Sequence, residues 1–352
     1  MKVCILGNGL ISLTVAKALV NQGIYVDIFS NQKKMMLNKV STLGISKSNI
    51  EFFNDNILNI EKFLWNINRI EIFSENLENK KILNFENDNK RLFSIIKSYE
   101  LYDFLYSHLT KNKFFSFKNK INNNDYKLLI NCDFNNKITK KFFFKKFRKN
   151  YKSYAHTAII EHAKLKKNYV ASQIFTKEGP MAFLPMSDKK TSIVYSMKGK
   201  KKVNLESLIK KYNTKYEINR IGSTYSFELK SSALRTYYHK NILAFGDLLH
   251  KLHPLAGQGY NMSIRDIKEL LKLIKYKINH GLDLDISICS DFEKKTRNKN
   301  FLFLNGIDFI YQFFNLESKV ETNILSKSVK LLNRNKYFKK LFTEFADNGI
   351  VF

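Results

Sequence analysis

Hydrophobic residues in the first thirty positions follow the pattern of a strand, a helix and a second strand. Residues 2–6 and 25–29 are short apolar runs, and Ala16 and Leu19 fall on one helical face that ends near Gly23. An element order of strand, glycine turn, helix and strand over this length predicts a βαβ unit with parallel strands.

A second strand–turn–helix pattern lies between residues 241 and 271. The apolar run 242–245 predicts a buried strand, Gly246 and Asp247 interrupt it, and a polar loop follows. Beyond the loop a helix is expected to begin at Asn261, because apolar residues then recur at helical spacing, namely Ile264, Ile267, Leu270, Leu271 and Ile274.

The remaining pattern predicts a sheet and several helices. A hairpin is expected at residues 69–73 and 81–85, followed by a strand at 92–96, a helix at 101–109 and a strand at 128–130. One antiparallel sheet is expected from strands at 155–161, 169–175, 181–186, 191–197 and 225–229. Helices are expected at 48–58, 291–300, 301–314 and 325–342.

Residues 139–150, TKKFFFKKFRKN, alternate clusters of lysine and phenylalanine. They predict a helix, which would either lie on a membrane surface or pack its phenylalanine face on the protein while the lysines extend into solvent. The pattern favours the second interpretation.

Composition excludes several classes of protein. The 352 residues are enough for two domains, and the three cysteines are far apart, which argues against a zinc site and a disulfide framework and suits a reducing cytosol. We expect no signal peptide before the first strand and no membrane span, since no apolar run reaches 18 residues.

The formal net charge is +29, but the lysines are spread along the whole chain. A chain-wide drift in composition explains this charge better than a nucleic-acid partner does, and we expect none. A basic surface would still be attracted to an anionic leaflet, so the expected location is the cytoplasm, with peripheral contact at the inner face of the membrane as an option.

Both glycine turns have the features of anion sites. Gly7 allows a tight turn and Gly9 a close approach of ligand to backbone, just before a helix. Three of the chain's 13 glycines and one of its 3 prolines fall between Gly246 and Gly259, again before a helix.

The second turn carries a longer motif. Its residues are Gly246-Asp247, His250, His253-Pro254, Gly257-Gln258-Gly259, Asn261 and Asp266. This series resembles the GDAAH…P…GQG.N…D signature of the FAD-dependent aromatic monooxygenases, and most of all the ubiquinone-biosynthesis hydroxylases, which have the para-hydroxybenzoate hydroxylase fold. The other two prolines, in Gly179-Pro180 and Leu184-Pro185, also match positions typical of that subgroup.

The resemblance implies an α/β fold in which a Rossmann-like FAD-binding domain carries an inserted, mostly antiparallel β-sheet substrate domain and C-terminal helices. The FAD-binding domain would comprise residues 1–68, 90–150 and 235–290, the substrate domain 69–89 and 151–234, and the helical region 291–352. Residues expected to bind FAD are Gly7, Gly9, Leu10, Ile11, Ser12, Ser30, Lys39, Asp133, Gly246, Asp247, Pro254, Gly257, Gln258, Gly259 and Asn261. The loop of Pro254, Leu255, Ala256 and Gly257 would lie along the flavin next to the substrate, with further substrate contacts from Phe183, Leu184 and Pro185.

The implied reaction is hydroxylation of the aromatic ring of a polyprenylated phenol by O₂ through a flavin hydroperoxide. FAD carries that chemistry, so the absence of a Ser-His-Asp set, paired carboxylates or a metal cluster from the motifs is consistent. His250 and His253 fit a role in the loop near the flavin better than a metal site. The electron donor, NAD(P)H or a reductase system, stays open, and a quinone-biosynthesis complex is a further partner that the resemblance implies.

Three positions depart from the family pattern. Ser30 stands where an acidic residue would bind the ribose, Tyr99 where an arginine would touch FAD, and Phe134 where a glycine would allow a positive φ. These departures keep two alternatives open: a flavin reductase of the same fold that inserts no oxygen, and a scaffold subunit of a quinone-biosynthesis complex with an impaired FAD site.

Overall fold

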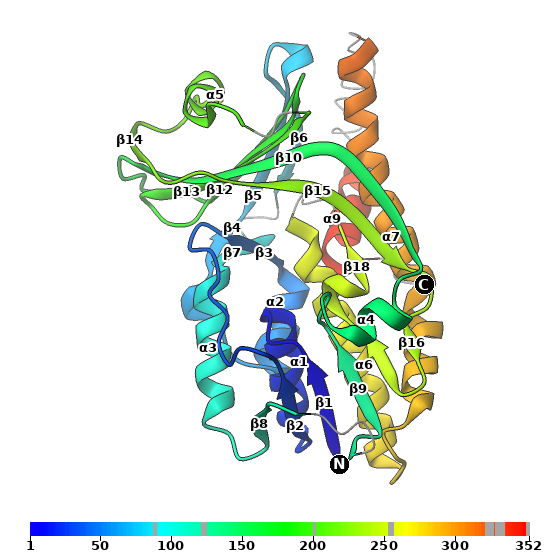
Figure 1. Cartoon of the computed structure of the whole chain (residues 1–352). Helices are drawn as coiled ribbons and strands as arrows, with labels where there is room; N and C mark the ends of the chain where they lie inside the picture. The colour runs from blue at the N-terminus through cyan, green and yellow to red at the C-terminus, as the bar shows by residue number, and fades with distance from the viewer. Residues whose placement is uncertain are drawn as a thin grey trace.

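The structure, a computed structural model, describes residues 1–86, 90–120, 125–199, 202–252, 257–320, 327 and 335–349. Figure 1 shows an α/β layer at the bottom that contains the N-terminus, and a large sheet that crosses above it. Long C-terminal helices run along one side of both layers.

The sheet of the α/β layer has six strands. Their order is β16 (Tyr238–His239), β17 (Ile242–Ala244), β9 (Leu128–Asn131), β1 (Lys2–Leu6), β2 (Tyr25–Phe29) and β8 (Phe115–Lys118). All neighbours are parallel except β16 and β17. Parallel strands are covered on both faces, which explains why these segments are continuous apolar runs. The predicted strands at 2–6, 25–29 and 128–130 are confirmed.

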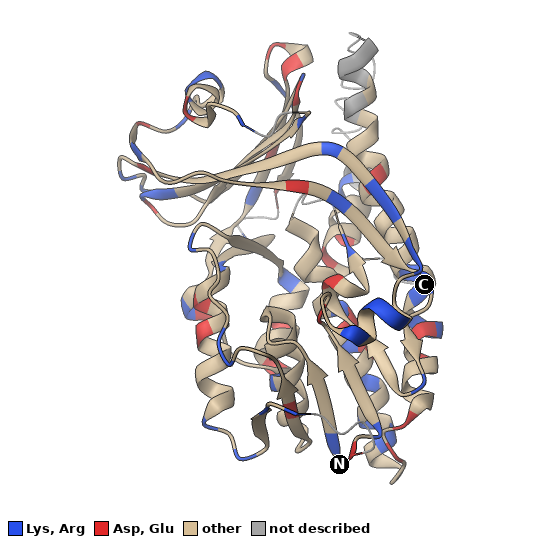
Figure 2. Ribbon diagram, viewed as in Figure 1, with Lys and Arg blue, Asp and Glu red and all other residues tan. Residues whose placement is uncertain are grey.

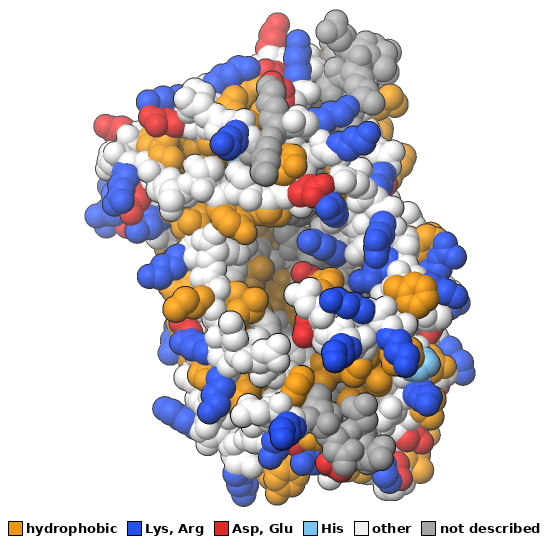
Figure 3. Space-filling model, viewed as in Figure 1, with side chains coloured by type: hydrophobic (Ala, Val, Ile, Leu, Met, Phe, Trp, Pro, Cys, Tyr) orange, Lys and Arg blue, Asp and Glu red, His pale blue; other side chains and the backbone are white. Residues whose placement is uncertain are grey.

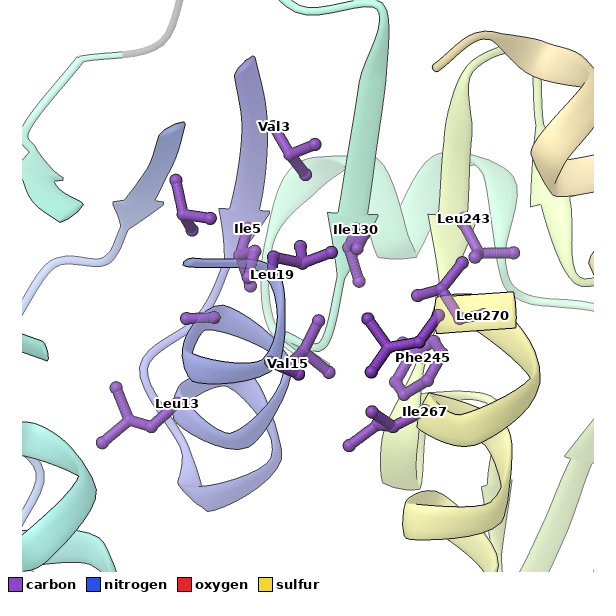
Figure 4. Packing of buried hydrophobic residues seen from close by; sticks show 14 of the residues in the cluster. Val3, Ile5, Leu13, Val15, Leu19, Ile130, Leu243, Phe245, Ile267 and Leu270 are labelled. Carbon is purple, nitrogen blue, oxygen red and sulfur yellow. The ribbon is translucent and has the colours of Figure 1, made fainter. Parts of the chain in front are cut away.

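The core of this layer packs strand residues against two helices that are distant in sequence. Figure 4 shows Val3, Ile5, Ile130 and Leu243 of the sheet beside residues of α1 (Leu10–Val20) and α6 (Gln258–Asn279). The labelled helix and turn residues are Leu13, Val15, Leu19, Phe245, Ile267 and Leu270, and all are buried. The two helices are thereby fixed against the same sheet, so their N-termini lie at the edge where the parallel strands end.

Other helices surround this layer and the sheet above it. They are α2 (Lys47–Asn56), α3 (Ser98–Thr110), α4 (Lys137–Phe142), α5 (Leu205–Tyr212), α7 (Ile286–Val320) and α9 (Lys336–Asn348), with short 3₁₀ turns η1 (Glu61–Phe63), η2 (Glu75–Leu77) and η4 (Gly246–Leu248). Helix α6 begins at Gln258 and not at the predicted Asn261, because Gly257 takes the left-handed conformation (φ 62°) and starts the helix directly after it.

The upper sheet has nine strands. In order they are β18 (His250–Lys251), β15 (Tyr225–Leu234), β10 (Lys146–His162), β13 (Lys190–Lys198), β12 (Gly179–Pro185), β11 (Val170–Thr176), β5 (Arg69–Ser74) and β6 (Lys80–Glu86), and β14 (Ile218–Ile221) also pairs with β10. The predicted hairpin is confirmed as β5 and β6. The sheet is antiparallel except where β5 joins β11 in parallel, which brings a segment from early in the chain to its edge.

A small sheet lies between the two larger ones. It consists of β3 (Thr42–Ser46), β7 (Phe93–Lys97) and β4 (Trp65–Ile67), all antiparallel. β3 leads directly into α2. This sheet places the backbone of residues 42–46 next to the N-terminus of α6, where Asn261 hydrogen-bonds to it.

The predicted helix at residues 139–150 is wrong in its second half. Helix α4 ends at Phe142, and β10 begins at Lys146 and pairs with β15. Phe143 is buried, whereas Phe144 and Phe147 are exposed, so no continuous phenylalanine face packs on the protein. The pairing partner lies more than eighty residues further along the chain, and such tertiary pairing overrides local pattern.

The C-terminal helices differ from the prediction, and α7 is longer than expected. Residues 291–300 and 301–314 belong to one helix, α7, and α9 continues to Asn348, while part of the predicted helix at 325–342 lies outside the described residues. Among the helices that the structure describes, none is both long and apolar enough to cross a bilayer.

Candidate functional site

The parallel strands bring the first glycine turn and the second one to the same edge of the sheet. β1, β9 and β17 are adjacent and parallel, so Gly7, Asp133 and Gly246, which follow their ends, lie side by side. A Cβ atom built on Gly246 would lie 2.8 Å from Cγ2 of Ile11, so the start of α1 packs directly on the second turn. Two turns whose first glycines, Gly7 and Gly246, are 239 residues apart in sequence therefore form one surface.

Gly7 is required by its conformation and by its neighbours. Its φ is 98°, and an added Cβ would lie 3.3 Å from Cβ of Asp133 and 3.5 Å from Oγ of Ser12. Its N–H donates to the carbonyl of Phe29 at the end of β2. The residue thus closes the turn between β1 and α1 as predicted for a tight glycine turn.

Gly9 presents the N-terminus of α1 to open space. It is the N-cap of the helix, no side chain caps the first turn, and no acidic residue lies there. A Cβ added to Gly9 would meet nothing within 4 Å. The backbone N–H groups of Leu10 and Ile11, both half-buried, are in the first turn, where an α-helix leaves its N–H groups without intrahelical partners. This arrangement fits the pyrophosphate of a dinucleotide.

The end of β2 carries Ser30 at the position where the resemblance implies an acidic ribose ligand. Ser30 is half-buried, and its Oγ accepts a hydrogen bond from N–H of Gln32 at 3.3 Å. Asp27 points elsewhere, as expected: it forms an ion pair with Lys2 at 2.8 Å and accepts hydrogen bonds from Ser116 and Tyr126. Burial opposes ionisation of Asp27, but the bonds from Lys2, Ser116 and Tyr126 lower the pKa of its carboxyl overall. The negative charge of Asp27 is therefore already paired within the protein.

Two carboxylates border the joined turns. Asp133 is half-buried, and its Oδ1 accepts from N–H of Asn135 at 2.8 Å. Asp247 has an exposed side chain in η4, yet the protein around it disfavours the charged form and raises the pKa of the carboxyl.

The predicted strain at Phe134 is absent. Phe134 does not have a positive φ; among the residues that the structure describes, the non-glycine residues that do are Glu78, Asn79, Lys152 and Lys240. Its ring is exposed and lies under Nζ of Lys146, 5.3 Å from the ring centroid. The substitution of glycine by phenylalanine is therefore compatible with this turn.

Asn261 is fixed by protein groups on all sides. Its Oδ1 accepts from N–H of Ser46 at 2.9 Å and from Nδ2 of Asn49 at 3.0 Å, and its Nδ2 donates to the carbonyls of Gly44 and Gly257 at 2.8 and 3.3 Å. These bonds use both lone pairs and both hydrogens of the amide. Asn261 thus holds β3 against the second glycine turn.

Gln258 is the opposite case. Only 6 % of this residue is exposed, it lines the large cavity described below, and its Oε1 has no hydrogen-bond partner among the described residues. A buried acceptor without a partner costs about 1–3 kcal/mol, which a bound donor would recover. Gly259, next to it, has open space at its Cβ position. His253, Pro254, Leu255 and Ala256 lie outside the described residues.

A cavity of about 910 Å³ lies between the upper sheet, the small sheet and the C-terminal helices. Figure 3 shows the surface hollowed between the two layers. The lining is mostly apolar and comes from distant elements, including Gly44, Ile72, Phe85, Ala182, Leu184, Val194, Gly257, Gln258, Ile310, Phe313, Phe342 and Phe345. The second glycine turn therefore forms part of the wall of an apolar cavity.

Strand alternation decides which sheet residues reach the cavity. Ala182 and Leu184 of β12 line it, whereas Phe183 is 2 % exposed and packs on the other face with residues of α5. Of the three predicted substrate contacts in this strand, Leu184 alone is in the cavity lining. The predicted roles of Phe183 and Pro185 are wrong on this geometry, because successive side chains of a strand point to opposite faces.

Lys39 and Tyr99, two further positions that the family resemblance singles out, lie outside the cavity lining. Lys39 is exposed and outside the cavity lining, although its neighbours Asn38 and Val40 are in it. Tyr99 also lies outside the lining, and its hydroxyl donates to Oε1 of Glu100 at 3.1 Å.

Sequence reasoning missed two buried hydrogen-bonded groups behind the site. The hydroxyls of Thr14 and Tyr260 lie 2.8 Å apart and join α1 to α6. Nε2 of His250 hydrogen-bonds to Oδ2 of Asp266, whose Oδ1 accepts from Asn300 at 3.0 Å. His250 is thus tied to α6 and α7, and within the described part of the chain no group of three or more His, Cys, Asp or Glu residues could hold a metal ion.

Sequence reasoning also missed the contribution of α9. Its last turn is anchored where Oδ1 of Asp347 accepts from N–H of Ser48 at 2.9 Å and the Asp347 carbonyl accepts from the Ser46 and Ser48 hydroxyls at 3.1 Å. This anchor places Phe342 and Phe345 in the cavity wall. The amphipathic pattern of the segment was a signal for a packed helix, but not for its packing partner.

Comparison with known proteins finds relatives by sequence and by structure. Residues 141–281 match a family model described as an FAD binding domain. The chain is 25% identical over 274 residues to the mitochondrial ubiquinone biosynthesis monooxygenase COQ6 of Schizosaccharomyces pombe, covering 64% of this chain and 57% of that protein. It is 27% identical over 153 residues to the 3-demethoxyubiquinol 3-hydroxylase of Escherichia coli, covering 40% of this chain and 39% of the other.

Solved structures match over nearly the whole chain. The p-nitrophenol 4-monooxygenase PnpA of Pseudomonas putida superposes with a TM-score of 0.81 at 10% identity, covering 99% of this chain and 98% of that one. Klebsiella pneumoniae HpxO, solved with FAD and uric acid, gives a TM-score of 0.76 at 12% identity with 99% and 97% coverage. These likenesses establish the fold.

The sequence relatives are matched over a limited part of their own length. The chain spans 57% of the fission yeast protein and 48% of the ubiquinone hydroxylase UbiL of Rhodospirillum rubrum, to which it is 25% identical over 207 residues. Their whole activities therefore do not transfer directly. The chain thus carries a match to an FAD binding domain, is similar in sequence to ubiquinone-biosynthesis hydroxylases and monooxygenases, and has the fold of solved monooxygenases.

Proposed function

We propose that the chain is an FAD-dependent monooxygenase that hydroxylates the aromatic ring of a polyprenylated phenol in ubiquinone biosynthesis. The observation that carries this proposal is the cavity of about 910 Å³, mostly apolar, whose wall includes Gly257 and Gln258 of the second glycine turn. A single aromatic ring fills a small part of such a volume, and an isoprenoid tail suits the remaining apolar lining. The named relatives support the same substrate class.

FAD would be held at the joined glycine turns. The N-terminus of α1, with Gly7, Gly9, Leu10, Ile11 and Ser12, is proposed to bind the pyrophosphate, and Ser30 to face the ribose. Further contacts are proposed for Lys39, Asp133, Gly246, Asp247, Gly257, Gln258 and Gly259. Asn261, whose amide is fully used, is proposed to act by holding β3 against the second glycine turn. When bound, FAD would supply the redox chemistry that activates O₂.

The protein's own contribution would be positioning and exclusion of water. An apolar cavity shields the reacting groups from solvent and keeps the phenol ring next to the loop that leads into α6. Within that lining, the Gln258 amide is a buried polar group whose Oε1 has no partner among the residues that the structure describes, and it would accept a hydrogen bond from the ligand. We further propose that residues 69–89 and 151–234 form the substrate domain, as expected from the sequence, and that the substrate binds beneath them.

The test uses purified full-length protein. An FAD-like absorbance band after purification, O₂ consumption with a prenylphenol, and a product heavier by one oxygen atom are the expected results. FAD binding with an unchanged substrate mass would favour a reductase of the same fold. Failure to bind FAD at all would favour a scaffold subunit of a quinone-biosynthesis complex, the alternative that Ser30 supports because it lacks the charge of an acidic ribose ligand.

Gln258 gives a second, sharper test. Gln258→Leu keeps the size of the side chain but removes its acceptor, so ligand affinity should fall about tenfold, which corresponds to the loss of one hydrogen bond of ~1.4 kcal/mol. Isothermal titration with substrate phenol and, separately, with FAD would show which ligand the amide contacts. Gln173→Leu, at another glutamine of the cavity lining, is the matched control. If Gln258→Leu bound the phenol and FAD each as tightly as wild type does, this role of Gln258 would be contradicted.

A further inference from the structure

One surface of the molecule combines cations with exposed aromatic rings in a way that the proposed reaction does not use. We define the α4–β10 patch as the exposed side chains between residues 134 and 148. Its rings are Phe134, Phe144 and Phe147, which are 42%, 57% and 50% exposed. Its cations are Lys137, Lys140, Lys141, Lys145 and Arg148, which are exposed, together with the half-buried Lys146 beside Phe134.

No acidic residue occurs between positions 134 and 149. Lys149 at the end of this stretch pairs with Asp308 at 2.6 Å, but within the described part of the chain the six cations of the patch form no ion pair. Figure 2 shows α4 and the first part of β10 with dense basic positions on the face turned toward the viewer. Six unneutralised charges on so short a segment produce a locally strong positive potential.

The aromatic rings of the patch are held in place by the chain's own cations. Nζ of Lys146 lies 5.3 Å from the ring centroid of Phe134, the Arg235 guanidinium carbon 4.7 Å from that of Phe147, and Nζ of Lys145 6.0 Å from that of Phe144. Each ring thus has a cation over one face and remains partly exposed, although Phe147 also contacts the ring of Phe301. Exposed apolar rings next to cations match the boundary between lipid headgroups and acyl chains.

We propose that the α4–β10 patch docks on an anionic lipid bilayer. Phosphate headgroups would neutralise the lysines, and the three phenylalanine rings would enter the headgroup layer. Nucleic acid is the less suitable polyanion, because stacking with bases needs open ring faces and the chain's own cations already cover one face of each ring. The patch is on the face that Figure 3 shows hollowed between the two layers, so docking would turn that hollow toward the membrane.

The test is co-sedimentation of full-length protein with vesicles, which needs neither FAD nor turnover. Wild type should bind vesicles containing about 30% anionic lipid and should not bind neutral vesicles, and binding should weaken as salt rises from about 0.1 to 0.5 M. Lys140→Glu/Lys141→Glu should lower the apparent affinity at least about tenfold, since each cation near the surface contributes appreciably.

The control tests whether net charge alone explains binding. Lys166→Glu/Lys167→Glu changes the charge of the whole chain by the same amount at two exposed lysines in the β10–β11 loop, and it should bind as wild type does. Equal weakening in both double variants, or no binding of wild type to anionic vesicles, would overturn the proposal. Binding to single-stranded RNA that Lys140→Glu/Lys141→Glu abolishes, with no vesicle binding, would also overturn it and assign the patch to nucleic acid.

The aromatic part of the proposal has its own comparison. Phe144→Ser should reduce the binding that survives at high salt, whereas Tyr276→Ser, at a ring with the same exposure of 57% on α6, should leave it unchanged. Equal binding of Phe144→Ser and wild type at both salt concentrations would show that the rings do not enter the bilayer, contrary to the proposal. Melting temperatures of all four variants, each altered at exposed positions, verify that they are folded.

Discussion

The hydroxyls of Thr14 and Tyr260 lie 2.8 Å apart, and both residues are buried. Thr14 is in the second turn of α1 and Tyr260 in the first turn of α6, so this bond joins the two helices just behind their N-termini. The glycine turns that precede these helices are thereby held at a fixed separation. Any ligand that touches both turns depends on this junction.

Tyr260→Phe tests that dependence. The change removes one hydroxyl and keeps the ring, while Thr14 still donates to the carbonyl of Leu10 at 2.8 Å. We expect a loss of stability of about 1 kcal/mol, measured by urea denaturation, together with weaker FAD binding. Thr14→Val should give a similar loss, and the double variant should lose less than the sum, because both single changes remove the same bond. Fully additive losses would contradict the coupling.

Gly7→Ala and Gly9→Ala should have contrasting effects. An alanine at position 7 would have to adopt φ 98° with its Cβ 3.3 Å from Asp133, so we expect destabilisation of about 1–3 kcal/mol in thermal or urea unfolding. An alanine at position 9 meets no protein atom within 4 Å, so stability should change by less than about 1 kcal/mol. If that open space receives the cofactor, Gly9→Ala should nevertheless lose FAD affinity, which fluorescence titration would measure. Normal FAD binding by Gly9→Ala would contradict the proposed pyrophosphate site.

Ala182→Phe should shorten the cavity without disturbing the fold. Ala182 is half-buried and faces the cavity from β12, while its neighbours Met181 and Phe183 occupy the opposite face. A larger side chain here is expected to raise KM at least about tenfold for a phenol with a long prenyl tail and to affect a phenol without a tail much less. Steady-state kinetics with both substrates would measure the difference. Equal effects on the two phenols would place the tail elsewhere.

The two glycine turns and the βαβ unit were predictable because they are encoded locally. Gly7 and Gly246 each follow an apolar run and precede a helix, and a positive φ at both agrees with that pattern. The confirmed hairpin of β5 and β6 likewise depends on neighbouring residues.

What could not be predicted depends on contacts between distant segments. Residues 146–150 form a strand because β15 pairs with them, and Phe183 points away from the cavity because α5 covers that face of the sheet. The saturation of Asn261 by Ser46, Asn49 and Gly44 also requires three segments to meet. The sequence motif placed the polar residue Asn261 at the site, but only the packing shows that its side-chain amide stabilises the fold.

Because two cysteines are buried, we expect the stability of the protein to decrease at alkaline pH. Burial raises the pKa of the Cys4 and Cys289 thiols to about 12, from 9.0. A group whose folded pKa is raised contributes stability that is fully present below its unfolded pKa and is lost as pH rises through the folded value. The free energy of unfolding should therefore decrease between about pH 9 and pH 12. The Cys4→Ala/Cys289→Ala variant should show a shallower decrease in urea denaturation over that range, despite a lower stability at pH 7 from the two small cavities.

Alkylation at about pH 8.5 provides an independent measurement: both thiols, at 1% and 0% exposure, should react only after unfolding. Rapid modification of Cys4 or Cys289 in the folded protein would contradict their placement in the core of the α/β layer.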